Sequence, residues 1–202
     1  MARATVLLFD LGGVLVQSDG LAHLELIAPR DARQSVAEKW HSSRAVDLFE
    51  RGKIPPHEFA ASFIEEWNLE LNHSEFLALF ASWVKGFFPG AESLIEDLRA
   101  KHRVAYLSNT NAVHYANLPQ LSSLFDSGFA SHISGLMKPS PEAYAHAIAA
   151  LGVPPDNVYF FDDLEPNVVV AREAGMKAVQ VRGMAELKAA LQAEGLYGGR
   201  DT

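Results

Sequence analysis

Four groups of polar residues follow apolar stretches or lie in loops before helices, and their types suit chemistry on a charged substrate. In a parallel sheet, the carboxyl ends of the strands share one edge, so residues far apart in the sequence can meet there. We therefore expect these groups to form one site. They are Asp10, the tripeptide Ser108-Asn109-Thr110, Lys138 and the pair Asp162-Asp163.

A carboxylate, a hydroxyl, an ammonium group and an acidic pair are together suited to phosphoryl transfer. Asp10 is the candidate nucleophile, attacking phosphorus to form an aspartyl phosphate. Ser108 would donate a hydrogen bond to a phosphoryl oxygen, and Lys138 would neutralise charge there and keep Asp10 ionised. Because three carboxylates in one place repel each other, we expect Asp10, Asp162 and Asp163 to share a hard cation such as Mg²⁺.

The two glycines after Asp10 predict a loop whose backbone N–H groups can surround phosphoryl oxygens. Gly12 and Gly13, together with Asn109 and Thr110, are therefore the candidate substrate-binding residues. Each polar group also has an ordinary structural alternative, as a turn former, a helix cap or a solvated lysine. Their joint placement at strand ends and before helices favours the functional interpretation.

The elements that must position these residues alternate regularly after residue 88. Pro89-Gly90 precedes a helical pattern to about Lys101, and further helices are expected from Ser140 to Gly152 and from Asp163 to Gly175. This alternation predicts an α/β fold, a Rossmann-like parallel sheet with helices on both faces. The expected strands are 5–9, 103–107, 157–161 and 177–181, with a weaker one over about 127–133.

The segment 15–87 differs, since it carries helical patterns and almost no strand pattern. Ser43 is expected to cap a helix through Arg51 that ends at Gly52, Pro55-Pro56 to begin one to about Trp67, and a third to span His73 to Lys85. This shift in pattern predicts an α-helical module inserted after the first strand. Its tryptophans at positions 40, 67 and 83 are expected to pack the helices or to face a substrate.

Composition limits the remaining classes. The 202 residues carry a formal net charge of -8, which argues against nucleic acid or an anionic membrane as the main partner. The chain has no cysteine, which excludes disulfides and thiolate chemistry and agrees with a cytoplasmic location. No apolar stretch is long enough to span a bilayer. A small phosphorylated substrate is the expected partner, and the oligomeric state is not predicted.

In their order, these residues resemble the four motifs of the haloacid-dehalogenase-like hydrolase superfamily, over essentially the whole chain. The resemblance implies a catalytic core of residues 1–14 and 88–202 and a type-one helical cap of residues 15–87. It also implies that Asp10 is the nucleophile, that the Gly12 carbonyl joins the acidic residues around Mg²⁺, and that the cap closes over the site. The matching segments are Phe-Asp-Leu-Gly-Gly-Val at 9–14, Leu-Ser-Asn-Thr at 107–110, Met-Lys-Pro-Ser-Pro at 137–141 and Phe-Phe-Asp-Asp-Leu-Glu-Pro-Asn at 160–167.

The sequence departs from that family's phosphatases at Gly12, where a second aspartate commonly protonates the leaving group. The 2-haloacid dehalogenases also lack this aspartate, but they use no metal and keep no acidic pair like Asp162-Asp163. A second alternative is a phosphatase with an acidic leaving group, and the Asp-Leu-Gly motif resembles a subgroup that includes sugar-1-phosphate phosphatases. A third is a degenerate member that only binds a phosphorylated ligand. His114 is interpreted as a helix-surface residue and as the best substitute proton donor.

Overall fold

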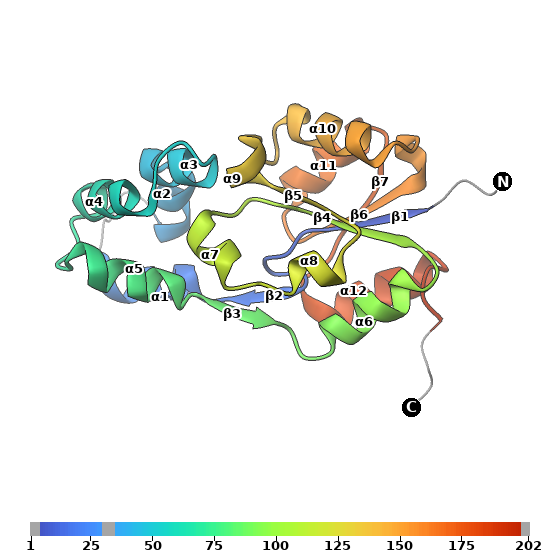
Figure 1. Ribbon diagram of the computed structural model, residues 1–202, viewed down its shortest axis with the longest axis horizontal. Helices are drawn as coiled ribbons and strands as arrows, with labels where there is room; N and C mark the ends of the chain where they lie inside the picture. The colour runs from blue at the N-terminus through green and yellow to red at the C-terminus, as the bar shows by residue number, and fades with distance from the viewer. Residues whose placement is uncertain (1–4, 30–34, 199–202) are drawn as a thin grey trace.

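The protein is built around a parallel sheet in the order β5-β4-β1-β6-β7 (Figure 1). The computed structural model describes residues 5–29 and 35–198. The α/β prediction is confirmed, because every neighbouring pair of strands in this sheet is parallel. In chain order the strands are β1 (Val6–Phe9), β4 (Arg103–Ser108), β5 (Ser127–Ala130), β6 (Val158–Asp162) and β7 (Lys177–Gln180).

Helices cover both faces of the sheet, which explains why its strands are continuous apolar runs (Figure 1). Leu7 and Phe9 of β1 point to one face, and Val6 and Leu8 point to the other. The first face packs on α6 (Ala91–Arg99), α8 (Leu121–Leu124) and α12 (Gly183–Ala193), and the second on α10 (Pro141–Leu151) and α11 (Glu165–Glu173).

No helix in the described part of the chain is long and apolar enough to cross a membrane.

The strand register brings the predicted polar residues to one edge. Phe9 in β1 aligns with Tyr106 in β4 and with Phe161 in β6. The next residue, Asp10, extends the ladder through a 2.8 Å hydrogen bond from its N–H to the Phe161 carbonyl. Asp10 therefore lies between the ends of β4 and β6, where Ser108 and Asp162 stand.

The cap helices lie together at one end of the sheet (Figure 1). A separate aromatic core holds them together. Phe49 stacks on Phe59 with ring centroids 4.2 Å apart, and Phe63 stacks on the fully buried Trp67 at 4.9 Å. Large buried rings give this small module a core of its own. Its helices are α1 (Gly20–Ile27), α2 (Val36–Ser42), α3 (Arg44–Glu50), α4 (Pro56–Trp67) and α5 (His73–Ala81).

Two of the three predicted cap helices are confirmed with their start signals. The Ser43 side chain accepts a hydrogen bond from the Val46 N–H and so caps α3, and Pro56 occupies the first turn of α4. In the core, helices 91–99, 141–151 and 165–173 also match the expected segments. Strand β5 is shorter than expected, because residues 131–134 turn into helix α9 (Ser131–Ser134).

The prediction of a helix from His73 to Lys85 is wrong at its end. Helix α5 stops at Ala81, and β3 (Val84–Phe87) pairs antiparallel with β2 (Val16–Ser18). Gly86 has φ of +98°, which is incompatible with a right-handed helix, and strand pairing satisfies the backbone instead. Lys85, expected at a helix end, forms a 3.0 Å ion pair with Asp19. This two-stranded sheet lies at both predicted domain boundaries, which themselves remain a prediction.

Gly52, in the cap, packs tightly against helix α9 of the core. A Cβ at Gly52 would lie 2.1 Å from the His132 carbonyl oxygen, and the residue has φ of +65°. The adjacent Arg51 donates a 3.0 Å hydrogen bond from its Nη1 to the Gly135 carbonyl. Helix α3 is therefore held against the core through backbone contacts at its C-terminal end.

We expect Gly52→Ala to destabilise the protein more than Gly86→Ala. Both sites have positive φ and so share a strain of about 1 kcal/mol for a side chain. Only Gly52 faces a backbone atom, since nothing lies within 4 Å of a Cβ at Gly86. Urea unfolding should show a loss for Gly52→Ala about twice that for Gly86→Ala or more. Equal losses would contradict the tight contact.

Candidate active site

Lys138 joins the two central carboxylates of the site. Its Nζ lies 2.9 Å from Asp10 Oδ1 and 2.6 Å from Asp162 Oδ2, and its side chain is only 2% exposed. Burial alone would lower the pKa of Lys138, but Asp10 and Asp162 raise it above its ordinary value. Lys138 therefore stays charged while buried, and it offsets one of the negative charges around it.

Asn109 positions the loop that carries Lys138. Its side-chain amide donates a 2.8 Å hydrogen bond to the Lys138 carbonyl, and its Oδ1 accepts a 2.9 Å bond from the Lys138 N–H. Both ends of the Asn109 amide thus hold the Lys138 backbone, and the predicted role of Asn109 in substrate binding stays a prediction.

Asp162 is fully buried and held by several hydrogen bonds. Its Oδ1 accepts 2.9 Å bonds from the Leu164 N–H and from Asn167 Nδ2, while its Oδ2 contacts Lys138. Both donors lie at the start of α11, so the helix start fixes this carboxylate. Asn167 belongs to the fourth motif, and its role here is to orient Asp162.

Three carboxylates form a cluster that suits a hard cation. Oxygen atoms of Asp10, Asp162 and Asp163 lie within 4.8 Å of one another. Burial raises the pKa of Asp10 to about 7, with Asp162 adding to the effect and Lys138 opposing it. Burial and Asp162 also raise the pKa of Asp163. Three carboxylates against one ammonium leave negative charge uncompensated, and the all-oxygen ligand set fits Mg²⁺.

The glycine loop also makes room for an acidic side chain at Gly13. Gly13 has φ of +71°, and a Cβ there would lie 2.6 Å from Asp163 Oδ2. Its N–H donates to the Val16 carbonyl at 3.0 Å, so it is not available to a phosphoryl oxygen. Gly13 thus makes room for Asp163, and its predicted place among the substrate-binding residues stays a prediction. Within the described chain no hydrogen bond reaches the Gly12 carbonyl, which leaves it available as a metal ligand.

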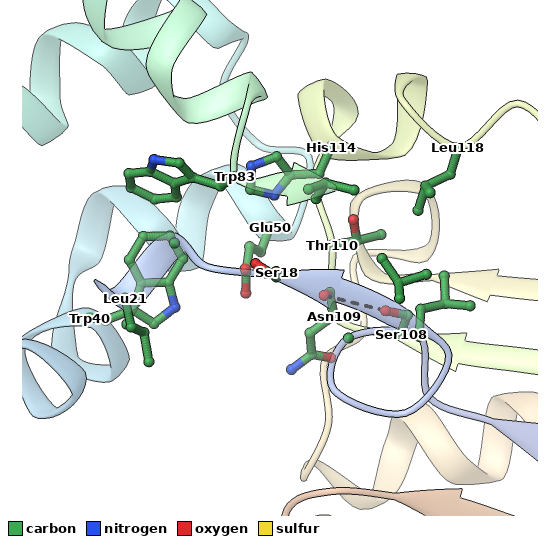
Figure 2. A pocket seen from close by; sticks show the side chains of 15 residues that line it. Ser18, Leu21, Trp40, Glu50, Trp83, Ser108, Asn109, Thr110, His114 and Leu118 are labelled. Carbon is green, nitrogen blue, oxygen red and sulfur yellow. Dashed lines mark hydrogen bonds between the residues drawn. The ribbon is translucent and has the colours of Figure 1, made fainter. Parts of the chain in front are cut away.

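Ser108 and Thr110 differ in how much of their hydrogen-bonding capacity is free. The Ser108 hydroxyl makes one long contact, 3.5 Å to the Asn109 carbonyl, so it can donate to a bound group instead (Figure 2). Thr110 has its backbone N–H and carbonyl both bonded to Ser131 Oγ at 2.9 Å. Ser108 therefore matches its predicted position, while the backbone of Thr110 is used to hold β4 and α9 together.

His114 is not a surface histidine, which corrects its predicted placement. It lies in helix α7 (Ala112–Ala116), and its ring stacks on Phe80 at 4.1 Å. Its Nε2 is 2.8 Å from the Phe80 carbonyl, which only accepts, so Nε2 carries the proton and Nδ1 accepts from the Asn111 amide at 3.1 Å. Burial lowers the pKa of His114 to about 4, despite the bond to Phe80. Its proton is engaged in linking core and cap.

Two adjoining cavities open around these residues. A cleft of about 510 Å³ contains Asp10, Lys138 and Asn167. A second cavity of about 200 Å³ is mostly apolar, and Figure 2 shows its two tryptophans opposite Ser108, Asn109 and Thr110. The second cavity has Leu11, Val16, Leu21, Trp40, Trp83, Val84 and Leu118 among its lining residues. Of the three cap tryptophans, Trp40 and Trp83 therefore line this cavity, and Trp67 packs the helices.

Glu50 is a site residue that the sequence reasoning missed. It is the last residue of α3 and lines both cavities. Burial raises the pKa of Glu50 to about 7, with Asp47 and Asp10 adding to the effect. The only sequence signal was an acidic residue beside Phe49 and two positions before Gly52, which does not by itself indicate a site.

Comparison with known families agrees with this geometry. Residues 4–175 match the family model of haloacid dehalogenase-like hydrolases. The chain belongs to this family. The predicted superfamily membership is therefore confirmed, and the dehalogenase-like hydrolase fold accounts for the parallel sheet with its helical cap.

Relatives of this dehalogenase-like hydrolase include phosphatases. It is 28% identical to the sesquiterpene phosphatase astK of Aspergillus oryzae, covering 84% of this chain and 85% of the relative. It is 29% identical to a D-ribitol-5-phosphate phosphatase of Bacteroides thetaiotaomicron, covering 86% and 90%. A solved enzyme of this family from Bacteroides thetaiotaomicron, in complex with magnesium and inorganic phosphate, is 27% identical with a TM-score of 0.74, covering 89% and 94%.

We expect Mg²⁺ to raise the melting temperature of this hydrolase. At a concentration about 100-fold above the dissociation constant, binding to the folded state adds about 2.7 kcal/mol, or about 5–10 °C for a chain of this size. Asp163→Asn should remove most of this shift, whereas the exposed Asp156→Asn should leave it unchanged. Thermal denaturation with Mg²⁺ and with EDTA measures the effect. Equal shifts in both variants would contradict a role of Asp163 in metal binding.

Proposed function

We propose that the protein is a Mg²⁺-dependent phosphomonoesterase that works through an aspartyl-phosphate intermediate on a small phosphorylated metabolite. The observation that carries this proposal is the buried Lys138, ion-paired with both Asp10 and Asp162 beside a third carboxylate. This site places a nucleophilic carboxylate, a fixed positive charge and an acidic cluster at one point. These groups suit phosphoryl transfer better than dehalogenation.

Each residue has a defined task in this mechanism. Asp10 attacks phosphorus, while the Ser108 hydroxyl and the Lys138 ammonium bind phosphoryl oxygens. The N–H groups of Leu11 and Gly12, which make no backbone hydrogen bond in the described chain, point to further phosphoryl contacts. Mg²⁺ would be held by Asp10, Asp163 and the Gly12 carbonyl, with Asp162 as the fourth metal-site residue. When bound, Mg²⁺ neutralises charge on the phosphoryl group.

The intact acidic pair favours this activity over dehalogenation. A 2-haloacid dehalogenase needs no metal, so the cost of placing Asp163 beside Asp10 and Asp162 would serve no purpose there. A degenerate binding protein would not need Lys138 to hold Asp10 so closely. Both alternatives predict different products, which the assay below separates.

The second cavity indicates what the leaving group looks like. Because Trp40 and Trp83 line it with several aliphatic side chains, we infer a leaving group with an apolar face. A sugar 1-phosphate, favoured by the missing side chain at Gly12, fits if its ring packs on a tryptophan. The sesquiterpene phosphatase relative, by its name, acts on an apolar compound, and the ribitol-5-phosphate phosphatase on a polyol phosphate. The net charge of -8 continues to argue against nucleic acid as a partner, and the cytoplasmic location stays a prediction.

Phosphate release from para-nitrophenyl phosphate tests the activity. We expect turnover with Mg²⁺, loss of turnover with EDTA, and a loss of about a thousandfold or more in Asp10→Asn, because the nucleophile is removed. Metal-independent chloride release from 2-chloropropionate would instead indicate a dehalogenase. Binding of phosphate esters by the folded protein without any turnover would indicate a degenerate member.

A substrate panel tests the leaving-group argument. Glucose 1-phosphate and glucose 6-phosphate carry the same ring but differ in leaving-group acidity, and phenyl phosphate adds an apolar ring. We expect higher kcat/KM for phenyl phosphate and glucose 1-phosphate than for glucose 6-phosphate. Trp40→Ala should raise KM for phenyl phosphate, because the ring loses a stacking partner. A preference for glucose 6-phosphate would contradict the argument from Gly12.

A further inference from the structure

Glu50 lies where the two cavities meet. The residues common to both are Gly12, Trp40, Glu50, Ser108 and Asn109, and Glu50 is the only one with an ionisable side chain. One cavity contains the nucleophile, and the other is the apolar space proposed for the leaving group. In Figure 2, Glu50 reaches from the cap to a position between the tryptophans and Ser108. The oxygen that joins phosphorus to the leaving group would pass through this junction.

The Glu50 carboxylate has no partner among the described residues. No hydrogen bond or ion pair joins it to them, although two cations are near in sequence or space. Arg51 is bonded to Asp47 at 2.8 Å and to the Gly135 carbonyl, and Lys138 is shared by Asp10 and Asp162. Burial and the nearby carboxylates of Asp47 and Asp10 raise the pKa of Glu50 to about 7, against the opposing effect of Lys138, and this keeps a substantial protonated fraction near neutral pH.

On the core side, the absence of a side chain at Gly12 leaves the junction of the two cavities open. Nothing lies within 4 Å of a Cβ built on Gly12. No core side chain therefore occupies the place from which a residue at position 12 would act. His114, the substitute expected from the sequence, has both ring nitrogens engaged with Phe80 and Asn111. Among the residues that line both cavities, Glu50 has the only carboxyl group.

We propose that Glu50, a residue of the cap, is the general acid of this enzyme. It takes the role of the side chain that is missing at Gly12. The inference rests on the phosphatase function proposed above. As Asp10 Oδ forms its bond to phosphorus, the bond from phosphorus to the leaving-group oxygen breaks, and that oxygen takes the Glu50 proton. Water then attacks the aspartyl phosphate, its proton returns to the Glu50 carboxylate, and phosphate leaves as the Asp10–phosphorus bond breaks.

A general acid matters most for leaving groups of high pKa. A purely structural role of Glu50 would instead affect esters with good and poor leaving groups equally. Glu50→Gln keeps the shape of the side chain but cannot donate in this way. We expect it to lower kcat/KM for an alkyl ester such as benzyl phosphate by about 100-fold or more, and for para-nitrophenyl phosphate by less than about 10-fold. Glu65→Gln, at an exposed position of α4, is the matched control and should change neither value.

A second variant separates proton donation from positioning. Gly12→Asp in the Glu50→Gln background should restore activity on benzyl phosphate, because its carboxyl group can occupy the open space at the junction. Equal losses of Glu50→Gln on both esters, or no recovery with Gly12→Asp, would overturn the assignment of Glu50. Wild-type inactivity on para-nitrophenyl phosphate, or activity that survives Asp10→Asn, would instead overturn the proposed function. Thermal denaturation of each variant identifies any loss caused by unfolding.

Discussion

The site depends on one interaction, the contact of the Lys138 ammonium group with both Asp10 and Asp162. It allows two carboxylates to be buried side by side, a placement that would otherwise carry a large electrostatic penalty. Much of the surrounding structure serves this placement. Asn109 ties down the Lys138 backbone, Asn167 orients Asp162, and the absence of a side chain at Gly13 admits Asp163.

The division between core and cap separates the two halves of the reaction. The core edge carries the groups proposed to act on phosphorus. Asp10, Ser108 and Asp162 lie at the ends of three neighbouring strands whose register places them together, and Lys138 comes from the loop after α9. The cap supplies Trp40, Trp83 and Glu50, which line the apolar cavity proposed for the leaving group. If Glu50 donates the proton, the enzyme can also release less acidic leaving groups despite Gly12, and the apolar cavity determines the substrate together with leaving-group acidity.

The sequence was sufficient for the sheet and the four motifs, because apolar runs and strand-end polar residues are local signals that a parallel topology brings together. It failed where tertiary contacts decide. Strand β3 forms because β2 is available to pair with it, so the segment ending at Lys85 could not be assigned from its own pattern. The bonds of Asn109 and His114 join segments that are distant in sequence. Glu50 becomes a site residue only when α3 docks on α9.

The contacts between cap and core also bear on how products escape. The chain passes between core and cap through the paired strands β2 and β3. Elsewhere in the described chain, three hydrogen bonds join the two parts: His114 to the Phe80 carbonyl, Asn117 to the Ala81 carbonyl and Arg51 to the Gly135 carbonyl. An outward rotation of the cap about these two strands has to break all three hydrogen bonds. The release of the proposed leaving group is thus tied to contacts between cap and core, and its rate can change without a change in the groups that act on phosphorus.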